Sequence, residues 1–172
     1  MRPVDRLPYD PVASSRRHWI AQGWDEAADG VAAVVSLMRG WQLCLNEAND
    51  VLRPLGLTFA RYQILGLLRG GERISLGQVG ARLWVTPGTV TSSVGRLEAA
   101  GLLRRAPDPN DGRTVLADIT PKGSRVFDEA VAQLNEGLFS SLPLSTDELA
   151  HLVGLMNKLR AAAGDTVGEA PS

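Results

Sequence analysis

Hydroxyl side chains and a single cation form a run in the middle of the chain, at Thr89, Thr91, Ser92, Ser93 and Arg96. Ser and Thr hydroxyls donate and accept hydrogen bonds, and an Arg guanidinium donates several, so such a set can contact base edges and phosphate oxygens. The side chains are also small enough to let a helix that carries them lie close to a base pair. A solvated helix face has the same composition, and the flanking elements are needed to distinguish the two.

The run lies in a predicted helix whose start and end are both marked. Thr86 can cap the helix, and Pro87 suits its first position, where the missing N–H costs nothing. Gly101 follows, as expected of a residue that closes a helix with positive φ. Free backbone N–H groups around Thr86, Gly88 and Thr89 offer a site for a phosphate. The buried face of this helix is predicted to consist of Val90, Val94 and Leu97.

A shorter helix is predicted just before it. Ser75 and Gln78 form a capping-box pattern, and Leu76, Val79 and Leu83 form one apolar face. A first helix of about nine residues and a second of about thirteen, joined by a few residues, fit the helix-turn-helix pattern.

Two short strands joined by a polar turn are predicted to follow. Residues 102–106 favour a strand, and residues 107–112 are dense in turn formers. Arg113 stands at the exit of the turn, where a cation on a hairpin tip can enter a narrow minor groove. Asp111 is close enough in sequence to hold the Arg113 guanidinium in one pose, although a plain surface hairpin with a weak ion pair fits as well. The buried face of the second strand is predicted to be Val115, Ala117 and Ile119.

The segment TPGTVTSSVGRLEAAGLLRRAPDPNDGRTVLADITPKG, residues 86–123, resembles the MarR family of bacterial transcriptional regulators. The motifs that carry the resemblance are a Thr- and Ser-rich helix ending in RLEAAGL, a DP-x-D-x-R turn and a following IT-P-x-G. Upstream, LRPLGLTFARYQILGLL also resembles the second helix of the family, and the likeness extends from about residue 31 to residue 160. Many members carry Arg or Asn at the positions of Ser92 or Ser93, so the family's base preference does not carry over.

The resemblance implies a winged helix-turn-helix and a homodimer in which the N- and C-terminal helices of two subunits interlock. The recognition helix would enter the major groove of a pseudo-palindromic site on double-stranded DNA, and Arg113, braced by Asp111, the minor groove. In the family a small molecule, often a phenolic or other aromatic acid, binds between the dimerisation and DNA-binding parts and releases the DNA. We therefore expect a ligand-responsive repressor, with Trp41, Arg61 and Tyr62 as candidate pocket residues.

The distribution of charge agrees with such a partner better than the net charge does. The 172 residues sum to −1, which argues against a strong polyanion binder. Residues 60–125, however, hold ten Lys or Arg and five Asp or Glu, so this stretch carries +5 and the rest −6. A basic middle between acidic ends is the charge pattern of a DNA-reading lobe on a larger acidic body.

The expected fold class is mainly α with a small β component. Residues 31–52 predict a long helix with two apolar stripes, which a dimer would cover more naturally than a monomer. The expected organisation is a flexible arm, N-terminal dimerisation helices, a DNA-binding lobe, C-terminal dimerisation helices and a disordered tail. Their boundaries are residues 1–13, 14–57, 58–120, 121–163 and 164–172.

Other functions have weaker signals. Cys44 is the single cysteine, so a redox-sensing regulator is one alternative; an inert core cysteine is the plainer interpretation. The other alternative is a winged helix that binds protein and does not read DNA. His18 and His151 lack ligand-spaced partners, and no catalytic motif occurs, so we expect no metal, no cofactor and no enzyme activity.

No apolar run approaches about 20 residues, and the first residues lack an apolar signal core. We therefore expect no membrane segment and a cytoplasmic location.

Overall fold

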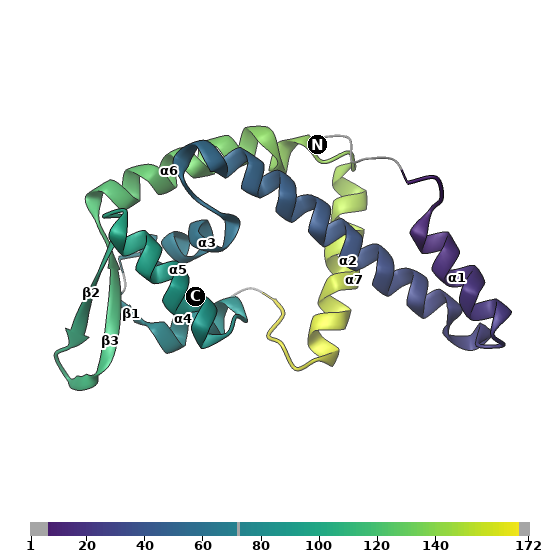
Figure 1. The fold of residues 1–172 in the computed structure, drawn as a ribbon, viewed down its shortest axis with the longest axis horizontal. Coiled ribbons are helices and arrows are strands. Elements are labelled where there is room, and N and C mark those ends of the chain that lie inside the picture. Colours follow the sequence, from purple (N-terminus) through teal and green to yellow (C-terminus); the bar gives the residue numbers. More distant parts are fainter. Residues whose placement is uncertain (1–6, 72, 169–172) are drawn as a thin grey trace. The chain divides into compact units, whose positions relative to one another are not determined.

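The structure is a computed structural model that describes residues 7–71 and 73–168 (Figure 1). It divides into two compact units, with the boundary between Ser140 and Ser141. The helices of the first unit are α1 (Pro11–Ala21), α2 (Asp25–Leu52), α3 (Phe59–Arg69), α4 (Leu76–Leu83), α5 (Pro87–Ala99) and α6 (Pro121–Gly137). Its strands are β1 (Ile74–Ser75), β2 (Leu103–Asp108) and β3 (Asp111–Ile119). Short 3₁₀ turns occur at Arg53–Leu55 and Phe139–Ser141, and the second unit contains α7 (Thr146–Ala162).

A winged-helix lobe is built from α3, α4, α5 and the sheet. The sheet has the strand order β1-β3-β2 and is antiparallel throughout. Helices and sheet share one apolar core, so the expected class, mainly α with a small sheet and a winged helix, is confirmed. The side chains of this core are fully or almost fully buried: Ile64, Leu65, Leu68, Ile74, Val79, Val90, Val94, Leu97, Leu103 and Ala117.

The helix starts of the lobe follow the local signals. The Ser75 side chain accepts a hydrogen bond from the Gln78 N–H, and the Gln78 side chain accepts one from the Ser75 N–H, so the predicted capping box of α4 is confirmed. Thr86 caps α5 by accepting from the Thr89 N–H, with Pro87 at the first position. Gly101, at φ 72°, follows the end of α5 in the left-handed conformation that the sequence predicted.

The hairpin is longer and its turn tighter than we expected. The strands reach Asp108 and begin again at Asp111, which leaves two residues between them where we predicted a six-residue turn. Pro107 lies inside β2, which is tolerated because β2 is an edge strand and its register shifts between Pro107 and Asp108. The predicted buried face is correct only near the base, since Ala117 is buried and Val115 is 42% exposed.

Both N-terminal helices begin earlier than the sequence indicated. Asp10 caps α1 by accepting from the Val12 N–H, and Pro11 occupies its first position, so residues 11–13 are helical rather than part of an arm. The remainder of the predicted arm, residues 1–6, lies outside the described residues. Helix α2 begins at Asp25, six residues before the predicted start, and its first turn carries two carboxylates that favour the positive end of the helix dipole.

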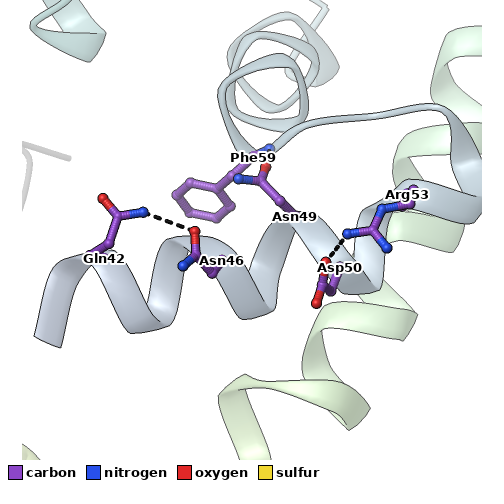
Figure 2. A network of polar contacts seen from close by, with 6 residues as sticks. All are labelled: Gln42, Asn46, Asn49, Asp50, Arg53 and Phe59. Carbon is purple, nitrogen blue, oxygen red and sulfur yellow. Dashed lines mark hydrogen bonds and ion pairs between the residues drawn. The ribbon is translucent and has the colours of Figure 1, made fainter. Parts of the chain in front are cut away.

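A side-chain bridge fixes the junction between α2 and the lobe (Figure 2). Asn49, near the end of α2, accepts a hydrogen bond of 2.8 Å from the Phe59 N–H. That N–H belongs to the first turn of α3 and has no partner within its own helix. Asp50, the next residue of α2, forms an ion pair with Arg53 in the 3₁₀ turn that follows the helix. These contacts set the direction in which the chain enters the winged-helix lobe.

Helix α7 is the helix of the second unit. It begins with a capping box, in which Ser145 and Glu148 form hydrogen bonds in both directions. Arg160, in the last turn of α7, forms an ion pair with Asp165 and donates to the Thr166 carbonyl. The first residues of the predicted tail therefore contact α7; residues 169–172 lie outside the described part. Among the described residues, no helix is long and apolar enough to cross a membrane.

Candidate nucleic-acid interface

The N-terminal half of α5 presents hydroxyl groups and backbone donors. The Thr86 and Thr89 hydroxyls lie 3.0 Å apart, and the Thr91 hydroxyl donates to the Pro87 carbonyl at 2.9 Å while its lone pairs stay free to accept. Gly88, Thr89 and Thr91 are exposed, as is Ser92. This end of α5 can therefore offer hydrogen bonds to a phosphate or to base edges.

Not every predicted contact residue is equally accessible. Ser93 is half-buried, whereas its neighbour Ser92 is exposed. Arg96 is exposed, two turns into the helix from Gly88. Among the described residues, its guanidinium makes no hydrogen bond or ion pair, so its charge remains available to a ligand.

The wing tip differs from our prediction in which group Asp111 holds. Its carboxylate accepts hydrogen bonds from the Arg113 backbone N–H at 3.0 Å and from the Thr114 hydroxyl at 2.8 Å, not from the Arg113 guanidinium. These hydrogen bonds lower the pKa of Asp111. A side chain two residues back reaches the backbone N–H more easily than the end of a long Arg. Asp111 therefore fixes the backbone of the tip and leaves the exposed Arg113 guanidinium free within the described residues.

Several arginines of the lobe are neutralised within the fold. Asp118 on β3 pairs with Arg104 at 2.6 Å and with Arg73 at 3.5 Å. Glu98 on α5 accepts hydrogen bonds from the Arg105 backbone N–H and guanidinium. Part of the basic charge of residues 60–125 is therefore neutralised by internal ion pairs. Arg96 and Arg113 are cations that remain available to bind a polyanion.

The three candidate pocket residues lie in different surroundings. Tyr62 stacks between Phe59 and Phe127, with ring centroids 5.8 and 5.2 Å away, and burial raises its pKa. Arg61 donates to the Gly56 carbonyl and the Thr58 hydroxyl. Trp41 lies on α2 and is 55% exposed. The described contacts do not join these side chains into one pocket.

Burial and the neighbouring positive charge of Arg96 lower the pKa of Arg61. Both causes disfavour a cation at that position. A bound anion would offset the repulsion between Arg61 and Arg96. This electrostatic coupling between α3 and α5 was not visible in the sequence.

The redox-sensing alternative depends on Cys44. Cys44 is a free, half-buried thiol in the middle of α2. In the part of the chain that the structure describes, no group of three or more His, Cys, Asp or Glu residues is placed to hold a metal.

Sequence reasoning missed two contributions to this interface. Strand β1 supplies the third strand of the sheet through pairing of Ile74 with Ala117, but two residues are too few for a periodic signal. The Glu98–Arg105 contact joins α5 to β2. Opposite charges seven residues apart across a helix end were its only trace in the sequence.

The second helix of the helix-turn-helix exposes a hydroxyl-rich face, and the hairpin that follows carries a free Arg at its tip. These features define a winged-helix protein of the DNA-binding type. A sequence profile of the MarR family matches residues 55–114. The multiple antibiotic resistance protein MarR of Escherichia coli is 31% identical over 113 residues, 64% of this chain and 78% of that protein.

Solved structures of related proteins superpose on this chain. Sco5413 from Streptomyces coelicolor, a MarR family transcriptional regulator, superposes with a TM-score of 0.73 and 36% identity over 80% of this chain and 99% of its own. A mutant MarR from E. coli complexed with operator DNA gives a TM-score of 0.67 and 27% identity over 76% and 93%. BpsR from Bordetella bronchiseptica, whose DNA binding is regulated by 6-hydroxynicotinic acid, gives 0.66 and 29% over 72% and 89%. The chain belongs to the MarR family of transcriptional regulators.

Proposed function

We propose that the protein is a homodimeric, sequence-specific DNA-binding repressor that a small molecule releases from a pseudo-palindromic operator. The observation that carries the proposal is the pairing of an exposed hydroxyl-rich helix start on α5 with the free guanidinium of Arg113 at the wing tip. A helix of this kind fits the major groove, and a cation on a hairpin tip fits the minor groove. The E. coli MarR complexed with operator DNA supports this use of the fold.

A second copy of the chain is the partner that the exposed apolar side chains favour. Such side chains are usually scattered singly on monomers, and contiguous sets mark interfaces. On α2 the exposed set is Val34, Leu37, Met38 and Trp41. On α7 it is Leu152, Val153, Leu155 and Leu159. A two-fold dimer would place two α5 helices on successive turns of one DNA face.

The effector is proposed to be a small, possibly aromatic, acid. Support comes from BpsR, whose DNA binding 6-hydroxynicotinic acid regulates. The pKa of Arg61 is lowered by burial and by the charge of Arg96, and a bound anion would offset the repulsion from Arg96. Release requires that the effector bind the DNA-free state more tightly than the DNA-bound state. Because its target is chromosomal DNA, we propose that the protein acts in the cytoplasm.

The test begins with selection of bound duplexes from a random-sequence DNA pool by the full-length protein. The affinity of a recovered duplex and of random DNA is then measured at several salt concentrations. We expect tighter binding to the recovered duplex and a steep inverse dependence on salt. Recovery of a palindrome with half-sites about one helical turn apart supports the dimer. Weak binding that is equal for all sequences would leave a winged helix that binds protein, and would overturn the proposal.

A further inference from the structure

The turn between α4 and α5 holds a tryptophan in an unusual position. Trp84 follows the last residue of α4 and is 77% exposed, more than any other large apolar side chain among the described residues. It is also the only residue other than glycine with positive φ in the described part, at φ 53° and ψ 44°. No aromatic contact of its ring occurs in that part of the chain.

Neither the backbone nor the packing explains why tryptophan stands there. Its N–H and that of Val85 both donate to the Gly80 carbonyl, which closes α4 in a left-handed cap. Glycine is the usual residue in that conformation, because a Cβ is disfavoured there. Since most of the indole faces solvent, its burial contributes little to the core. The side chain is therefore costly for the fold, which points to a contact outside it.

Its place in the chain indicates the partner. Trp84 lies two residues before Thr86, the N-cap of α5, so their Cα atoms are at most roughly 7 Å apart. A DNA strand held by the start of α5 therefore passes within reach of the indole. The apolar ring can pack on a deoxyribose, and the Nε1–H can donate to a phosphate oxygen.

We propose that Trp84 is an additional DNA-contact residue, which packs on the sugar–phosphate backbone beside the recognition helix and donates Nε1–H to a phosphate. This inference rests on the proposed function. Because the contact is uncharged and does not read a base, it strengthens binding to every sequence alike and leaves the salt dependence unchanged.

The test compares Trp84→Gly with the wild type on a duplex recovered by selection and on random-sequence DNA. We expect affinity for both to fall by about tenfold, with the same salt slope, while the melting temperature stays level or rises because the cap is relieved. Trp24→Phe is the matched control, since Trp24 is exposed at the turn between α1 and α2, and should bind as the wild type does. Wild-type affinity of Trp84→Gly would overturn the proposal.

A second measurement does not depend on the stability of a variant. The full-length protein is labelled with 5-fluorotryptophan, and the Trp84 resonance is assigned by its loss in Trp84→Phe. On addition of the recovered duplex this resonance should shift and lose its sensitivity to D₂O, while the other three tryptophans serve as internal controls. An unchanged resonance with DNA bound overturns this inference alone and assigns the indole to a protein surface. Failure of the wild type to bind DNA overturns both proposals.

Discussion

Glu98 joins the recognition helix to the wing through Arg105. One carboxylate oxygen accepts from the Arg105 backbone N–H at 3.2 Å, and the other accepts from its Nε at 2.8 Å. The contact crosses from the last turn of α5 to β2 and ties the two elements that are proposed to enter adjacent grooves. These hydrogen bonds hold Arg105 of β2 against the last turn of α5.

The Glu98 contact predicts a particular pH dependence. Hydrogen bonds from Arg105 lower the pKa of Glu98, so the folded state disfavours protonation of this carboxyl. Its contribution to stability is therefore complete above the ordinary pKa of a glutamate and is lost as pH falls through the lowered one. We expect Glu98→Gln to melt below the wild type at pH 7, and the two to converge between about pH 5 and pH 3. A constant difference in melting temperature across this range would contradict the prediction.

Arg113 and Arg104 make a matched pair for the minor-groove contact. The Arg113 guanidinium is free. Arg104, in contrast, forms an ion pair with Asp118, and Asp118 forms a second ion pair with Arg73. Arg113→Ala should weaken DNA binding by about 1–3 kcal/mol and relax base preference at the flanks of the site. Arg104→Ala should change the affinity much less. Binding to the recovered duplex and to flank variants measures both, and equal losses would show that the wing acts only through its net charge.

Gly123 predicts a packing limit at the start of α6. A Cβ at this buried position would lie 2.8 Å from the Leu102 carbonyl carbon and 2.9 Å from Ile119 Cγ1. Gly123→Ala should therefore lower the free energy of unfolding by at least roughly 1–3 kcal/mol. Gly95→Ala is the control, because nothing lies within 4 Å of a Cβ there, and should raise it by about 0.5–1 kcal/mol. Chemical denaturation of both variants decides the point.

Met38 tests the proposed dimer. It is 66% exposed on α2 beside other apolar side chains, and a carboxylate buried in a subunit interface would lack a partner. Met38→Glu should shift the protein toward monomer in sedimentation equilibrium and reduce its affinity for a duplex with two half-sites. Ser36→Glu places the same charge on an exposed polar position of the same helix. Equal behaviour of the two variants would remove α2 from the interface.

The sequence by itself determined the class of protein and the starts of α4 and α5, the two helices of the helix-turn-helix. The signals are short: Ser75 with Gln78 for α4, and Thr86 with Pro87 for α5. Each joins residues at most three positions apart, and the structure confirms both. The motifs around these helices were sufficient to indicate the MarR family, and the related sequences and structures confirm it. Such signals are readable because the chain forms these hydrogen bonds locally, whatever the rest of the fold does.

Only the tertiary structure decided which charges form internal ion pairs and how α2 is joined to the winged-helix lobe. Arg73 and Arg104 meet at Asp118, and Asn49 meets the Phe59 N–H, across turns and strands. These contacts join residues that the sequence separates by up to 45 positions, as from Arg73 to Asp118. Packing brings such residues together, and local spacing carries no record of it.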